Sequence, residues 1–167
     1  WIKRQNEGQT AIVHAQHPRT AAARFDVIVA QSHDALDGAN VLTVLGSMHD
    51  VTEASLVAAR EKWSDTFAKL PRPLIAVLIG GSNKTYLMTA EVTRRLAADL
   101  SRLRTAKGCG LLVIASRRTG AANLAILREE LSLPDIYFWD GSGENPYHAF
   151  LAAADAFLVS ADSVNMV

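Results

Sequence analysis

The sequence predicts an α/β protein with a Rossmann-like parallel sheet and helices on both faces. The first observation is that short buried apolar runs alternate with segments of helical periodicity from about residue 73 onward. The second is that each of these runs leads into a loop of small or polar residues. Strands that alternate with amphipathic helices form βαβ units, and such units build parallel sheets that helices cover.

The composition is that of a globular protein, with 49% apolar and 20% charged residues in a chain of 167. Seventeen basic residues balance seventeen acidic ones, which argues against nucleic acid as a partner. The single cysteine, Cys109, excludes an internal disulfide and a multi-cysteine metal site, and it fits a reducing, cytoplasmic location. The longest apolar run, residues 74–79, is too short to cross a bilayer, so we expect no integral membrane segment, although peripheral membrane contact stays open.

In the first half, apolar and β-branched runs predict three short strands, over residues 10–14, 25–30 and 41–45. Thr52 is the predicted N-cap of a helix whose apolar face extends from Leu56 to Leu70. The segment Pro71-Arg72-Pro73 ends this helix and is the best candidate for a domain boundary. We therefore predict two domains, residues 1–70 and 74–167.

The second half predicts four further strands, over residues 74–79, 111–115, 136–139 and 156–160. Between the first two lies a helix that Thr89 caps and Gly108 ends. A second helix carries Leu124, Leu127 and Leu131 on one face, and a third is capped by Asn145 with Pro146 in its first turn.

The loops after these four strands are the candidate functional sites, because ligands of open parallel sheets bind outside the carboxyl ends of the strands. Glycines permit close backbone approach, hydroxyls and arginines suit phosphate, and helix N-termini favour anions. The candidate substrate-binding residues are Gly80, Gly81, Ser82, Ser116, Arg117, Arg118, Thr119, Gly143, Glu144, Asn145, Asp162 and Ser163. Each also has a structural reading, as a tight turn, a solvated arginine pair or a helix cap. Trp139 is a core residue or a nucleobase shelf, with the core reading favoured.

Three motifs that would define a specific cofactor chemistry are absent. No G-x-G-x-x-G follows a strand, the segment from Gly80 to Thr85 lacks the second glycine of a phosphate-binding P-loop, and no Tyr precedes a Lys by four positions. In the first half, His33 and Asp34 follow a strand and are weak catalytic candidates, because a general base could lie there. A polar loop is the commoner reading, and no metal site is expected, because adjacent residues on an extended chain point in opposite directions.

The chain begins with Trp1 and ends on a strand that leads into what resembles the start of a helix. We expect it to be a piece of a longer protein, and to lack a complete active site by itself.

Several segments recur in order along the chain: residues 16–19, 25–29 with His33-Asp34, 40–42, 76–81, 116–119, 139–141 with 143–147, and 161–164 with Met166. Together these segments resemble the mitochondrial-fission "elongated mitochondria" family, which also has many bacterial members. The resemblance covers nearly the whole chain.

The resemblance implies a likeness to glycosyltransferases of two facing Rossmann-like domains, the GT-B arrangement. It implies that residues 1–70 end an acceptor-side domain and that residues 74–167 form most of a donor-binding domain. Gly80, Gly81, Ser82, Asp162 and Ser163 would then hold a donor diphosphate. The loops around Arg118 and Glu144 would border the base and ribose.

The leading interpretation is thus a nucleotide-sugar-binding, glycosyltransferase-like protein without a cofactor other than its donor substrate. The alternatives are a non-catalytic scaffold or regulator that kept the fold, and a nucleoside-diphosphate-sugar epimerase, the label that bacterial members of the family often carry. The absent dinucleotide fingerprint makes the epimerase the weakest of the three.

Overall fold

The computed structural model describes residues 5–6, 8–46 and 48–162. The chain divides into two compact units, Trp1–Asp50 and Val51–Val167. The predicted α/β class with parallel sheets is confirmed, because every paired strand in both units runs parallel to its neighbour.

The first unit contains a three-stranded sheet in the order β1-β2-β3. Its strands are β1 (Val13–Ala15), β2 (Val27–Gln31) and β3 (Val41–Val44), with short 3-10 helices at Ala22–Arg24 and Ser32–Asp34. The first two strands start two or three residues later than predicted. Just before the two strands, the Ile12 amide donates to the Asp26 carboxylate at 2.7 Å, so a side chain takes the place of a backbone acceptor there, while the Asp26 amide donates to the Ile12 carbonyl at 2.9 Å.

The second unit contains a four-stranded sheet in the order β6-β5-β4-β7. Its strands are β4 (Leu74–Ile79), β5 (Gly110–Ala115), β6 (Ile136–Phe138) and β7 (Ala156–Val159), which match the four predicted ranges to within two residues. The chain adds β5 and β6 on one side of β4 and then crosses back to add β7 on the other side. The order of the strands therefore reverses between β4 and β7, which is where ligands of doubly wound sheets bind.

Four α-helices lie in the described part of the second unit: α2 (Glu53–Phe67), α3 (Ala90–Lys107), α4 (Ala121–Glu130) and α5 (Tyr147–Ala153). The predicted caps of α2 and α3 are present, whereas Pro146 and not Asn145 occupies the N-cap position of α5. Thr52 and Ser55 form a reciprocal capping box on α2, Thr89 caps α3, and Gly108 ends α3 in the left-handed conformation. Asn145 accepts the N–H of Tyr147 at 3.0 Å, and α5 begins one residue later than predicted.

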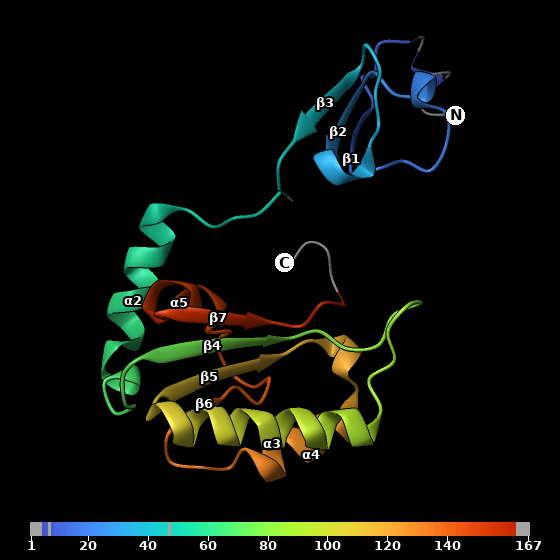
Figure 1. Ribbon diagram of the computed structural model, residues 1–167. Coiled ribbons are helices and arrows are strands. Elements are labelled where there is room, and N and C mark those ends of the chain that lie inside the picture. Colours follow the sequence, from blue (N-terminus) through green and yellow to red (C-terminus); the bar gives the residue numbers. More distant parts are fainter. Residues whose placement is uncertain (1–4, 7, 47, 163–167) are drawn as a thin grey trace. The chain divides into compact units, whose positions relative to one another are not determined.

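The helices cover both faces of this sheet, as Figure 1 shows. On one face, Val77 of β4 and Val113 of β5 pack in a core with Leu100 of α3 and Leu127 of α4. On the other face, Ala76 and Leu112 pack with residues of α2 and α5. Strand residues alternate between the two cores because side chains in a strand point to opposite faces.

The boundary between the units lies about twenty residues earlier than the proline-rich segment that the sequence suggested. Helix α2, which the sequence places in the first domain, packs on the second sheet. Phe67 of α2 contacts Tyr137 of β6 and Phe150 of α5, with ring centroids 5.5 and 5.8 Å apart. The prolines end α2 without separating it from the sheet, since a helix can pack against the strand that follows it across a short turn.

Candidate functional site

Three of the four predicted loops meet around one carboxylate at the carboxyl ends of β4, β5 and β7. Asp162 accepts hydrogen bonds from the amide of Gly81 at 3.1 Å and from the guanidinium of Arg118 at 2.6 Å. Its other oxygen accepts the hydroxyl of Ser160. The Asp162 side chain is only 5% exposed, so these donors replace the water that a carboxylate needs. We call this group of loops the Asp162 cluster.

The carbonyl and amide of Gly80 complete the cluster. Its carbonyl accepts the hydroxyls of Ser116, at 2.6 Å, and of Thr119, which is buried. Its amide donates to the hydroxyl of Ser160 at 2.7 Å. The hydroxyls of the β5 loop therefore hold the β4 loop in place.

The structure shows why positions 80 and 81 are both glycine, and the reason differs from the one that the sequence suggested. A Cβ atom at Gly80 would lie 2.1 Å from both carboxylate oxygens of Asp162. A Cβ atom at Gly81 would lie 2.2 Å from the carbonyl carbon and oxygen of Arg118. The close approach that requires glycine is thus between neighbouring loops, and both amides already donate to side chains of the cluster.

A cavity of about 430 Å³ lies beside this cluster, within the volume range of small-molecule sites. It is bounded by the ends of β4, β5 and β6 and by the start of α5. Its lining residues are Leu78, Ile79, Ile114, Ala115, Ser116, Arg117, Trp139, Asn145 and Tyr147. We call it the strand-end cavity.

The two adjacent arginines of the β5 loop have different roles. Arg118 is paired with the buried carboxylate of Asp162 and belongs to the cluster. Arg117 lines the strand-end cavity, and it has no side-chain hydrogen bond or ion pair with any residue that the structure describes. Arg117 is therefore the arginine whose charge is available to a ligand.

The loop after β6 divides its predicted residues between two places. Asn145 lines the strand-end cavity. Glu144 instead forms an ion pair with Lys62 of α2, and Gly143 takes a left-handed conformation with φ of 66°. Ser82, from the β4 loop, accepts the amide of Met88 at 3.0 Å and shapes its own loop.

Trp139 lies at the end of β6 and lines the cavity, so part of its ring system is available to a ligand. Its indole N–H donates to the carbonyl of Ser142 at 2.9 Å, which orients the ring. Neighbouring Asp140 accepts both the hydroxyl and the amide of Ser142. These two bonds, and the nearby charge of Arg128, hold the pKa of Asp140 below its ordinary value.

Six residues of the site were absent from the sequence-based candidates. Ser160 was treated as the last residue of a strand, Tyr147 only as part of a family segment, and the other four as members of the predicted strands: Leu78, Ile79, Ile114 and Ala115. The sequence still contained a signal for them, because each one lies within one residue of the end of a strand, or at the start of a helix, at the carboxyl edge of a parallel sheet.

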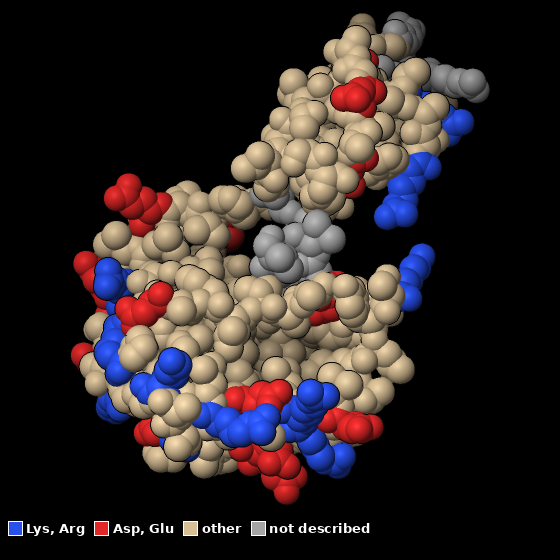
Figure 2. Space-filling model, in the orientation of Figure 1, with Lys and Arg blue, Asp and Glu red and all other residues tan. Residues whose placement is uncertain are grey.

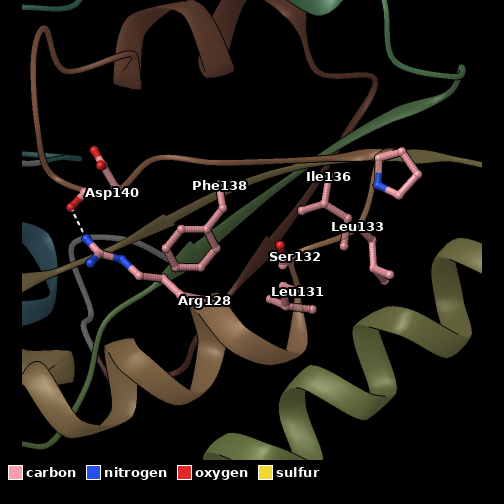
Figure 3. Close-up of a pocket in the computed structure, with 8 residues that line it drawn as sticks. Arg128, Leu131, Ser132, Leu133, Ile136, Phe138 and Asp140 are labelled. Carbon is pink, nitrogen blue, oxygen red and sulfur yellow. Dashed lines mark hydrogen bonds between the residues drawn. The ribbon is translucent and has the colours of Figure 1, made fainter.

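A second hollow, of about 420 Å³, lies along the outer strand β6 and beside α4. Figure 3 shows Arg128 extended past Phe138 toward Asp140, whose carbonyl it reaches. Leu131 and Ile136 line the remainder. Since its arginine already bonds the protein, this hollow offers a ligand little beyond apolar contact.

The catalytic candidates of the first unit, His33 and Asp34, lie in the 3-10 helix that directly follows β2. His33 Nε2 is 4.0 Å from Asp34 Oδ1. This places the pair at the carboxyl end of a parallel strand, as expected, and nothing else in the geometry marks it as catalytic. Within the described ranges, no group of three or more His, Cys, Asp or Glu side chains is arranged to hold a metal ion.

The distribution of charged side chains and the hydropathy of the helices are both in line with the balanced charge and the short apolar runs of the sequence. Figure 2 shows basic and acidic side chains intermingled over the lower part of the face that it draws, which covers the second unit. None of the helices in the described part of the chain has the length and apolar character needed to cross a bilayer. Predicted Ser163 lies outside the described residues.

The second unit is thus a Rossmann-like α/β module with a loop cluster and a cavity at the carboxyl ends of its strands. The chain matches the family model described as Mitochondrial fission ELM1 over residues 1–167, and it belongs to that family. It is 29% identical to the Mitochondrial fission protein ELM1 of Arabidopsis thaliana, over 99% of this chain and 44% of that protein. The chain therefore spans less than half the length of this curated relative. No solved structure matches it.

Proposed function

We propose that the second unit binds the nucleoside diphosphate of a nucleotide sugar and that the protein is glycosyltransferase-like. The observation that carries the proposal is the strand-end cavity. At the carboxyl ends of β4, β5 and β6, it combines an aromatic ring, polar side chains and an arginine that has no side-chain partner among the described residues. A nucleoside diphosphate needs the same three features, because it has a flat base, a ribose and a doubly charged diphosphate.

Arg117 is the proposed diphosphate contact. Its guanidinium has no partner in the described structure, and a planar fork of donors suits phosphate oxygens. Arg118 is the proposed positioning residue, because its pairing with Asp162 fixes the loop from which Arg117 projects. This modifies the expectation from the family resemblance, in which the glycine amides hold the diphosphate and Arg118 borders the base.

The proposal predicts that alanine substitutions of these two arginines have different effects, measured by calorimetric titration with uridine and guanosine diphosphates and by thermal unfolding. Arg117→Ala should weaken binding about tenfold or more, since a charge-assisted hydrogen bond contributes about 1.5–3 kcal/mol. Its thermal unfolding midpoint should match that of the unsubstituted chain. Arg118→Ala should lower both the affinity and the midpoint.

A matched control is Arg102→Ala on α3, where an exposed arginine pairs with Asp99 three residues earlier. It removes the same charge from the same unit at a distance from the cavity, and it should leave nucleotide binding unchanged. Loss of binding in this variant as well would mean that net charge, and not the cavity, governs the affinity.

One observation favours a non-catalytic scaffold instead. The Asp162 cluster is internally satisfied, because the amides of Gly80 and Gly81 and the side chain of Arg118 already have partners. A loop cluster built only to hold the fold would have the same property. No heat and no stabilisation with millimolar nucleotide, from a folded protein, would reject the nucleotide proposal in favour of this one.

We also propose a cytoplasmic location for this nucleotide-binding protein, which the single cysteine led us to expect.

A further inference from the structure

The strand-end cavity also has features that would distinguish one class of nucleobase from another. We propose, resting on the proposed function, that it selects a base with a carbonyl at pyrimidine position 4 or purine position 6, as uracil and guanine have, over a base with an amino group at that position, as cytosine and adenine have. The specificity-determining residue is Asn145, and Trp139 is the stacking residue.

The base end of the cavity is an apolar floor made by three neighbouring strands. Leu78 is the last but one residue of β4 and pairs in register with Ile114 of β5. Trp139 follows β6, and its amide donates to the carbonyl of Val113 at 3.0 Å, so it continues the same row. Alternation along the strands directs Leu78, Ile114 and Trp139 to the face that α5 covers. Such a floor suits a flat aromatic ring.

Trp139 is held in one orientation before any ligand arrives. Its indole N–H bonds the carbonyl of Ser142 at 2.9 Å, so the only donor of the ring is already used. The side chain therefore contributes its aromatic surface to the cavity. This surface can stack on any base, whatever the pattern of hydrogen-bond donors and acceptors of that base. Discrimination between bases must come from a polar side chain.

Asn145 is the polar side chain with a defined donor. Its Oδ1 accepts the backbone N–H of Tyr147 at 3.0 Å. This bond assigns the carbonyl end of the amide to the helix start and leaves the NH₂ end without a partner in the described structure. An NH₂ group donates and cannot accept, so it pairs with a base carbonyl and opposes a base amino group.

The remaining polar groups of the cavity do not reverse this preference. The hydroxyl of Tyr147 can donate or accept, so it favours neither kind of base. Arg117 is also a donor only, and Ser116 already donates to the carbonyl of Gly80 while it accepts the amide of Arg118 at 3.1 Å. The polar lining is therefore rich in donors, and a ligand with acceptors at both the diphosphate and the base complements it.

Uridine and cytidine diphosphates provide the sharpest test, because they differ only at one edge of the base: position 4 carries a carbonyl beside N3–H in uracil and an amino group beside an unprotonated N3 in cytosine. In calorimetric titration, the unsubstituted chain should bind uridine diphosphate about tenfold or more tightly than cytidine diphosphate. The reason is that the amino group of cytosine would meet the NH₂ group of Asn145, and two donors that face each other leave a polar group unpaired. Equal affinities, or a preference for cytidine diphosphate, would overturn the inference and leave the proposed function standing. Failure of both nucleotides to bind would overturn both.

Asn145→Asp is the decisive variant. A carboxylate can still accept the amide of Tyr147, so the start of α5 is preserved, while the donor toward the cavity becomes an acceptor. The added negative charge weakens both nucleotides alike, so the ratio of their affinities is the readout. We expect the ratio to fall to about one or to reverse. A preference for uridine diphosphate that persists unchanged in this variant would show that Asn145 does not read the base.

Trp139→Leu separates stacking from selection. It should weaken uridine and cytidine diphosphates by the same factor of about tenfold, because stacking is tolerant of base identity. A change in their ratio would contradict the division of roles. The comparison of the two nucleotides on the unsubstituted chain requires no variant, so the inference can be refuted even if a substituted chain does not fold.

Discussion

The Asp162 cluster makes a prediction about stability that follows from its hydrogen bonds. Replacement of Asp162 by Ala removes the acceptor of the buried Gly81 amide and the partner of the Arg118 guanidinium. An orphaned buried amide costs about 1–3 kcal/mol. The ion pair adds only about 0–1 kcal/mol, because the Arg118 side chain is 43% exposed and water screens it. The expected loss is therefore about 1–4 kcal/mol.

The assay is urea denaturation of the chain, followed by tryptophan fluorescence. Trp63 and Trp139 both belong to the second unit, so their signal reports the unit that contains the cluster. The midpoint and slope of the transition yield the free energy of unfolding. Asp99→Ala is the matched control, because Asp99 pairs with Arg102 on an exposed helix surface, and its loss should change stability by less than about 0.5 kcal/mol.

The reasoning would be refuted if Asp162→Ala unfolded within about 0.5 kcal/mol of the unsubstituted chain. A double-mutant cycle with Arg118→Ala then tests the pair itself. Residues in direct contact are expected to show a coupling energy of about 0.5 kcal/mol or more. Additive effects of the two substitutions would mean that the guanidinium does not depend on this carboxylate.

Three further predictions address the scaffold beneath the site. Phe150→Ala should destabilise the second unit by about 3–5 kcal/mol in the same denaturation assay, because the ring is fully buried; a loss below about 1 kcal/mol would contradict this packing. Thr52→Ala should cost about 1 kcal/mol through the N-cap of α2, whereas Thr52→Ser should be nearly neutral. The amide of Leu74 and then Arg72 hold the pKa of Asp155 below its ordinary value, so its contribution to stability is present above about pH 4 and is lost as pH falls through the lowered pKa. Asp155→Asn should therefore lose less stability on acidification than the unsubstituted chain, and superimposable pH profiles would disprove this.

Much of the second unit could be predicted because its signals are local. A strand of six apolar residues such as Leu74–Ile79, a cap such as Thr89 and a left-handed glycine such as Gly108 depend on neighbours within about four residues. Such patterns also imply the parallel sheet, because a helix between two strands forces a crossover. The first unit was predicted less closely, since three-residue strands such as Val13–Ala15 have bounds set by their partner strand.

The site depended on contacts between distant residues, which no local pattern contains. Ser116 bonds a carbonyl 36 residues earlier, Arg118 bonds a carboxylate 44 residues later, and Glu144 reaches Lys62 across 82 residues. The sequence by itself determined which residue types stand at the carboxyl ends of the strands, and hence that a polar edge exists. Only the tertiary structure decided that Arg117 faces a cavity while Arg118 is paired, because two adjacent and chemically identical side chains differ only in what the rest of the chain places beside them.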